Sequence, residues 1–142
     1  MNQIISAQRT GNDELDLELI QKAELAIIIG IIAYIISFIS ANLDKEDIFS
    51  REKGLKPVNN IKASELAALS SALGLLNNII SVNVAIERLK EVESSIKSGN
   101  DSVSITPNIN IANGCILSVV GSIFVTTGVI QRLNEQAQIT II

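Results

Sequence analysis

Three long stretches of this chain contain no charged residue, and charged or turn-forming segments separate them. These stretches span residues 25–43, 66–86 and 102–131. Nothing that breaks a helix interrupts the first stretch, since a single glycine costs about 1 kcal/mol in a helix interior. The pattern predicts one all-α domain over residues 1–142, with three long helices of which two to three are strongly apolar.

Capping residues and turn signals place the ends of these helices. Acidic Asp13, Glu14 and Asp16 suit the positive end of a helix dipole and follow the capping oxygen of Asn12, so the first helix is predicted over 12–43. Residues 44–60 contain Gly54 and Pro57 and are expected to form a polar connector with at most one short helical turn.

The second helix is predicted over 61–98 and ends before Gly99. Its charged last third keeps apolar residues at three- and four-residue spacing, which is typical of an amphipathic helix in water. Apolar and polar residues alternate around Pro107, so residues 102–111 are expected to form an extended segment or edge strand. The third helix is predicted over 112–138.

Small residues share one side of each predicted helix when positions are projected at 100° per residue. Such residues at four- and seven-residue spacing let two backbones approach closely. The alternative is chance, which is strongest in the third helix because Val125 interrupts its row. The predicted packing seam comprises Ala26, Gly30, Ala33 and Ser37, then Ala67, Ser70, Gly74, Asn77, Asn78 and Ser81, and finally Gly114, Ser118, Gly121 and Gly128.

Three asparagines interrupt the apolar part of the second helix. Asn77 and Asn78 lie on its small-residue side. There they either line a polar lumen or donate across a helix pair, or, as we favour, bond to each other and to backbone groups. Asn83 projects from the bulky side instead. It needs a partner there, so we predict that it contacts another helix or subunit.

The composition raises the question of what covers the bulky faces. Apolar residues make up 47% of the chain and charged residues 18%. Three helices alone have too few partners for this much aliphatic surface, so lipid or neighbouring copies must bury it. The chain is therefore expected either to assemble with itself or to enter a membrane.

The first hypothesis is a self-assembling structural subunit of the coat, tube or filament type, located in a virion or an extracellular filament. Its long polar extensions and its two-sided second helix favour this interpretation, and so does the absence of Trp. The alternative is a small oligomeric protein of the cell membrane, with a pore around Asn77 and Asn78 as one form. A two-span hairpin with a cytoplasmic middle fits the positive-inside rule, whereas three spans distribute Lys and Arg six against five.

Few groups are available for chemistry. The chain has no His and one Cys, so it lacks the usual general base, the commonest metal ligand and any internal disulfide. We expect no enzyme activity, cofactor, metal or small-molecule substrate. Cys115 is interpreted as a small packing residue. The net charge of −4 does not attract nucleic acid. As coated cargo, nucleic acid would have only Lys45, Arg51, Lys53, Lys56, Lys62, Arg88, Lys90 and Lys97 to contact.

Overall fold

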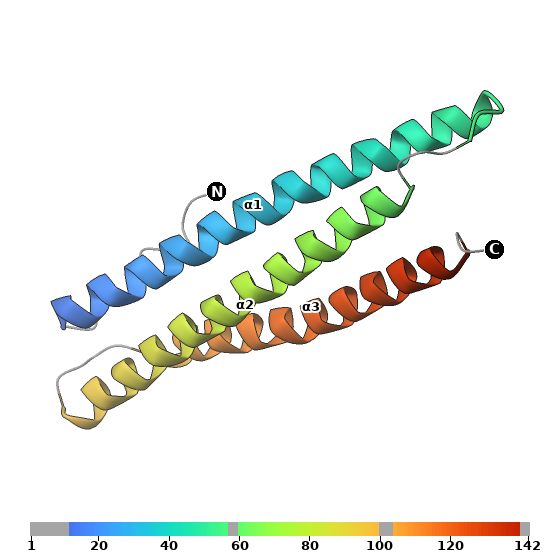
Figure 1. Ribbon diagram of the computed structural model, residues 1–142. Helices are drawn as coiled ribbons and strands as arrows, with labels where there is room; N and C mark the ends of the chain where they lie inside the picture. Colours follow the sequence, from blue (N-terminus) through green and yellow to red (C-terminus); the bar gives the residue numbers. More distant parts are fainter. Residues whose placement is uncertain (1–11, 57–59, 100–103, 140–142) are drawn as a thin grey trace.

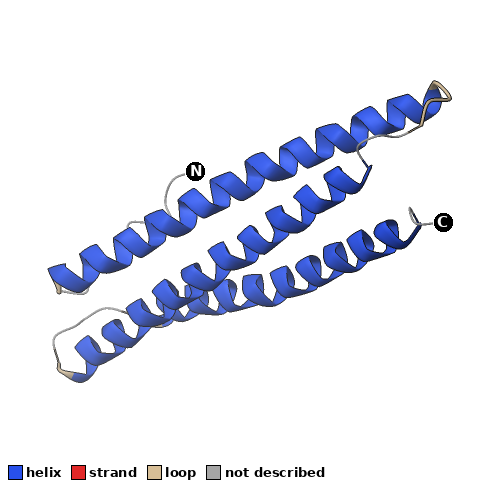
Figure 2. Ribbon diagram, in the orientation of Figure 1, coloured by secondary structure: helices blue, strands red, loops and turns tan. Residues whose placement is uncertain are grey.

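The computed structural model describes residues 12–56, 60–99 and 104–139. It contains three α-helices, α1 (Asp13–Glu52), α2 (Asn60–Lys97) and α3 (Thr106–Ile139), and no strand within these ranges (Figures 1 and 2). The prediction of an all-α fold with three long helices is confirmed.

The first helix is longer than the sequence pattern predicts. It begins as expected, because the Asn12 side chain accepts a hydrogen bond from the Leu15 amide at 3.3 Å. Asn42 does not end it, since its Nδ2 donates to the Phe38 carbonyl at 3.0 Å within the helix. Most of the predicted polar connector is therefore wrong, because residues 44–52 continue α1.

Gly54 supplies the stop signal that ends α1. Its φ of +72° lies in the left-handed region that favours glycine. The Leu55 amide then donates to the Ser50 carbonyl at 2.9 Å, and the Gly54 amide donates to the Arg51 carbonyl at 3.0 Å. These two bonds form a Schellman motif, which satisfies carbonyls that the helix end leaves free.

The limits of α2 lie within one residue of those predicted, and the cause of its end is also the predicted one. Gly99 has a φ of +80° and follows the last turn, where its amide donates to the Ile96 carbonyl at 3.1 Å. The polar and charged last third of the helix thus remains helical up to Lys97.

The predicted extended segment over 102–111 is wrong for most of the residues that the structure describes. Residues 106–111 form the first turns of α3, and residues 102 and 103 lie outside the described residues. Pro107 is compatible with this position because the first turn of a helix does not need its missing amide. Ile105 lies directly before the helix, where its carbonyl accepts a hydrogen bond from the Ile109 amide at 3.1 Å.

The three helices form an open layer rather than a closed bundle. Neighbours along the chain run antiparallel, and α2 lies between α1 and α3 (Figure 1). Within the described residues, α1 and α3 do not pack against each other. There is consequently no common core that all three helices enclose.

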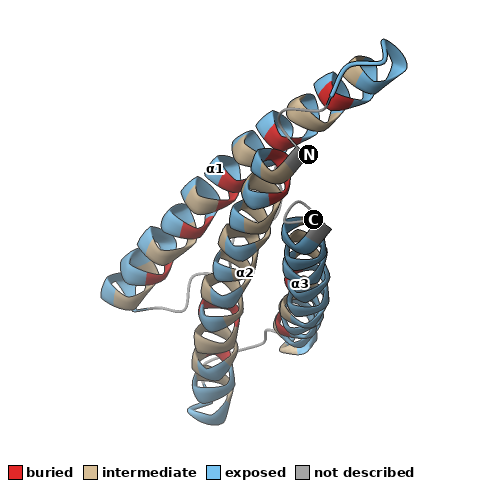
Figure 3. Ribbon diagram, turned by 45° about the vertical axis from the view of Figure 1, so that its right-hand side comes forward, coloured by how far each residue is buried: buried red, intermediate tan, exposed pale blue. Residues whose placement is uncertain are grey.

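Burial is confined to narrow lines of mostly small residues where α2 meets its neighbours (Figure 3). Five of the six buried residues of α1 are spaced seven apart, which is the period of helices that cross at a shallow angle. Most large hydrophobic side chains lie outside these lines, with 80% of Tyr34, 69% of Phe38 and 70% of Leu117 exposed. The buried residues of α1 are Leu19, Ala26, Gly30, Ala33, Ser40 and Asp47.

Candidate functional site: the polar seam along α2

Pairs of adjacent residues at seven-residue spacing allow α2 to contact both of its neighbours. Neighbouring positions of a helix point about 100° apart, so one member of each pair serves α1 and the other serves α3. Three pairs carry hydrogen bonds or close contacts, and the fourth continues the pattern with two buried apolar side chains. We call this arrangement the doublet seam; its pairs are Ala63 and Ser64, Ser70 and Ser71, Asn77 and Asn78, and Val84 and Ala85.

The first member of each doublet lies against α1. The Ser40 hydroxyl donates to the Ala63 carbonyl at 2.7 Å, and the Ser70 hydroxyl donates to the Ala33 carbonyl at 3.0 Å. Further along both helices, a Cβ added to Gly30 would lie 3.5 Å from Cγ of Asn77. The backbones of α1 and α2 are thus close enough for short hydroxyl side chains to bridge them.

The second member of each doublet lies against α3. The Thr126 hydroxyl donates to the Ser71 carbonyl at 3.1 Å, and Asn78 Nδ2 donates to the Ser122 hydroxyl. Further along, the Ser64 hydroxyl donates to the side chain of Gln136. Among the described helices, α3 packs only against α2, and these bonds fix its position there.

The predicted seam residues of α1 and α2 lie mainly at these contacts. Ala26, Gly30 and Ala33 are buried, whereas Ser37 is exposed. The six seam residues of α2 are half-buried, although a Cβ at Gly74 would meet nothing within 4 Å. Asn77 Nδ2 donates to Asn78 Oδ1 at 3.5 Å, and Asn78 Nδ2 donates to the Ser118 carbonyl at 3.5 Å. The two asparagines therefore bond to each other and to a backbone group, as favoured above. The six residues of α2 are Ala67, Ser70, Gly74, Asn77, Asn78 and Ser81.

Three of the four predicted seam residues of α3 do not lie at contacts between the described helices; the exception is Ser118, whose carbonyl accepts a hydrogen bond from Asn78 Nδ2 at 3.5 Å. All four are exposed, and a Cβ at any of the three glycines would meet nothing within 4 Å. The residues that face α2 instead are mixed in size and repeat at three- and four-residue spacing, a signal that a search for small residues misses. The exposed residues are Gly114, Ser118, Gly121 and Gly128; those turned towards α2 are Ala112, Cys115, Val119, Ser122, Thr126, Val129, Leu133 and Gln136.

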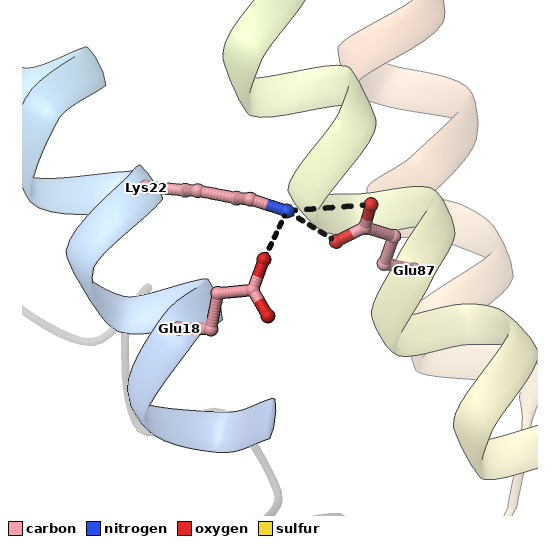
Figure 4. A network of polar contacts seen from close by, with 3 residues as sticks. All are labelled: Glu18, Lys22 and Glu87. Carbon is pink, nitrogen blue, oxygen red and sulfur yellow. Dashed lines mark hydrogen bonds and ion pairs between the residues drawn. The ribbon is translucent and has the colours of Figure 1, made fainter. Parts of the chain in front are cut away.

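An ion pair joins α1 and α2 near the start of α1 (Figure 4). Lys22 Nζ lies 2.9 Å from Oε1 of Glu18 within α1 and 3.1 Å from Oε2 of Glu87 on α2. Hydrogen bonds to Glu18 and then to Glu87 raise the pKa of Lys22. In the last third of α2, the hydrogen bond from Lys97 lowers the pKa of Glu93. Both pairs are partly exposed, so they act mainly on register and orientation.

The contacts between helices align the uncharged stretches of the three helices at a common level along the helix axes. Glu65 and Glu87 delimit 21 uncharged residues of α2, which span about 31 Å at 1.5 Å per residue. At one limit, Glu87 pairs with Lys22 of α1. At the other limit, the side chain of Gln136 accepts a hydrogen bond from Ser64, which directly precedes Glu65. Gln136 lies one turn from Arg132 on α3. The layer therefore has an uncharged band with charged residues on both sides of it.

The basic residues considered for nucleic acid lie at opposite ends of the layer. One group lies in the sequence between the uncharged stretches of α1 and α2. The other group follows Glu87 in the last third of α2. Along α2 alone, Lys62 and Arg88 are about 39 Å apart. They do not form one continuous strip. The first group is Lys45, Arg51, Lys53, Lys56 and Lys62, and the second is Arg88, Lys90 and Lys97.

All three helices are long and apolar enough to cross a membrane. No protein-family model, curated protein or solved structure matches the chain. Within the described ranges, no group of three or more His, Cys, Asp or Glu residues is placed to hold a metal ion. The doublet seam and the uncharged band are thus the features that bear on function.

Proposed function

We propose that this protein is a small, non-enzymatic integral membrane protein that crosses the bilayer three times. The single observation that carries the proposal is the uncharged band shared by the three helices. Its span of about 31 Å on α2 matches a hydrocarbon core of about 30 Å. Lipid then covers the exposed Ile, Leu and Phe side chains. A soluble monomer rarely exposes so much contiguous apolar surface to water.

The open layer also suits a bilayer. In water, a helix that is apolar on several sides must bury those sides against other helices, yet α1 and α3 each pack against only one. In lipid, helices associate instead through close backbone approach and hydrogen bonds between them. The hydroxyl and amide bonds of the doublet seam are contacts of this kind.

Three spans are favoured over a two-span hairpin by the position of α2. A hairpin that leaves α2 in water would need α1 and α3 to pair with each other, and they do not pack together. The nearly equal numbers of Lys and Arg on the two sides give no strong preference for orientation. We therefore propose three spans without assigning a cytoplasmic side.

Fractionation of cells that produce the protein tests this proposal. We expect the chain in the membrane fraction, resistant to washing with alkaline carbonate and released by detergent. A peripheral protein would be washed off by carbonate. Recovery of the chain as a soluble monomer without detergent would contradict the proposal.

A second candidate is a soluble coat, tube or filament subunit whose apolar faces are buried by identical neighbours. The observation that favours it is the length of α1, since 40 residues extend about 60 Å, roughly twice the thickness of a hydrocarbon core. The same fractionation separates the two candidates. Lipid-free particles that sediment without detergent would support the coat and contradict the membrane protein.

A further inference from the structure

The side of α2 that faces away from both neighbours carries one polar residue among aliphatic ones. We call this side the outer face of α2; it comprises Leu69, Ala72, Leu76, Ile79 and Asn83, and all five are exposed. At 100° per residue, these positions lie opposite the two rows of the doublet seam. The side chain of Asn83 makes no hydrogen bond to the part of the chain that the structure describes.

Asn83 lies inside the uncharged band rather than at its edge. It precedes Glu87 by four residues, or about 6 Å along the axis. Side chains in a helix tilt towards its N-terminus, which here directs the amide towards the middle of the band. Asn113 of α3 is also exposed near this limit, but α3 runs the opposite way, so its side chain tilts outwards towards the charged end.

An amide in this position needs a partner that lipid does not supply. An unsatisfied polar group in hydrocarbon costs several kcal/mol. Asn carries two donors and an acceptor, so two identical residues can satisfy each other. Copies inserted in the same orientation present Asn83 at the same depth.

We infer that two copies of the chain pair through the outer face of α2, with the Asn83 side chains of the two copies hydrogen-bonded to each other. This inference rests on the proposed membrane location. The two α2 helices run parallel about a two-fold axis along the membrane normal, and each residue of the outer face meets its own counterpart.

The sequence of the outer face fits such a pair. Leu69, Leu76 and Asn83 are spaced seven apart, with Ala72 and Ile79 three residues after the two leucines. This is the spacing of helices that pack along a seam, in which a single polar Asn fixes register and the number of strands. The next position in the row is Lys90, where two like charges repel, so the contact ends near the limit of the band.

The test measures pairing of the full-length chain in phosphatidylcholine vesicles by single-molecule photobleaching over a series of lipid dilutions. Wild type is expected to show two-step bleaching that declines on dilution. Asn83→Leu is expected to weaken pairing about threefold to thirtyfold, the range that hydrogen bonds between membrane helices provide. Asn83→Gln keeps the amide and is expected to pair more tightly than Asn83→Leu.

Asn113→Leu is the matched control, because it also removes an exposed asparagine near the same limit of the band, and it is expected to pair like wild type. Wild type that remains monomeric would overturn the inference, as would an Asn83→Leu variant that pairs like wild type or no more weakly than Asn113→Leu. Carbonate washing of the same vesicles separates the two proposals. A retained monomer contradicts only the pairing, whereas a chain that washes off contradicts the membrane location itself.

Discussion

Short polar side chains make most of the specific contacts between these helices. The Ser40 and Ser70 hydroxyls reach backbone carbonyls of the adjacent helix, and Thr126 does the same from α3. Ser81 instead donates to the Asn77 carbonyl one turn earlier in its own helix, at 2.9 Å. These Ser and Thr residues thus satisfy their hydroxyls without any water, as a lipid environment requires.

Gly30 and Gly74 were grouped in the same predicted seam, but the structure separates their roles. Gly30→Leu is expected to destabilise the protein by about 1–3 kcal/mol, because the larger side chain would collide with Asn77. Gly74→Leu is expected to change stability by less than about 0.5 kcal/mol, since a Cβ there meets nothing within 4 Å. Unfolding in mixed micelles with increasing dodecyl sulfate measures both.

Gly30→Ala serves as the control for that comparison. Its Cβ would lie 3.5 Å from Asn77, an ordinary van der Waals distance, so it is expected to be tolerated. Equal loss of stability in Gly30→Leu and Gly74→Leu would show that the observed α1–α2 contact does not determine the effect.

The Lys22–Glu87 pair supports the register of α1 against α2 and can be tested by exchanging its charges. Lys22→Glu places three carboxylates together with Glu18 and Glu87, and is expected to speed hydrogen exchange in the first turns of α1. Adding Glu87→Lys restores one attraction between the helices and is expected to slow exchange again. Exchange rates that are the same in single and double variants would exclude a contribution from this pair.

At the scale of the helices, the sequence predicts their number and most of their limits, because apolar runs, caps and glycines act locally. Two limits were predicted incorrectly for a shared reason. The charged residues in 44–52 suggest a loop, and the alternation of apolar and polar residues in 106–111 suggests a strand. Neither segment, however, contains a residue that a helix cannot accept at that position, and both are helical. Gly54, with its positive φ, was the effective stop signal of α1.

The packing side of α3 was harder to predict than its limits. Its glycines Gly114, Gly121 and Gly128 lie away from α2, and Ser118 is exposed and contacts α2 through its backbone carbonyl. The side chains that α2 meets form a row of mixed size. Several sides of a strongly apolar helix are suitable for contact, so composition alone does not select one. The choice depends on the partner, here on Ser71 and Asn78 of α2, which bond to Thr126 and Ser122.

Each row of the doublet seam is expected to act mainly on its own neighbour. Asn78→Ala removes the side-chain bonds to α3 and is expected to weaken the α2–α3 contact by about 0.6–2 kcal/mol, with a smaller effect on α1 through the bond from Asn77 to Asn78. Ser70→Ala removes a bond to α1 and is expected to have the complementary effect. Disulfide trapping between cysteine pairs placed across each contact, in a Cys115→Ser background, reports the two contacts separately.

If either variant lowered the trapping efficiency at both contacts equally, the two rows would be coupled. This would contradict a layer in which α1 and α3 each depend on α2 alone. Ser81→Ala is a suitable control, because its hydroxyl bonds only within α2 and its loss is expected to leave both contacts unchanged.

At the scale of the whole molecule, the main property is an excess of apolar surface over partners within the chain. The sequence predicts this excess, since its apolar stretches exceed what three helices can cover. It does not predict the common level of the charged limits, which depends on contacts between distant residues such as Lys22 with Glu87 and Ser64 with Gln136. That common level is the reason for assigning the surface to lipid.

Labelling of single cysteines in sealed membrane vesicles tests this account most directly. Lys56→Cys lies between α1 and α2 and Ser98→Cys lies between α2 and α3, each exposed, in a Cys115→Ser background. A membrane-impermeant maleimide added outside is expected to label only one of the two, and to label the other after the vesicles are opened. Labelling of both positions from the same side would contradict a layer of three helices that crosses the membrane.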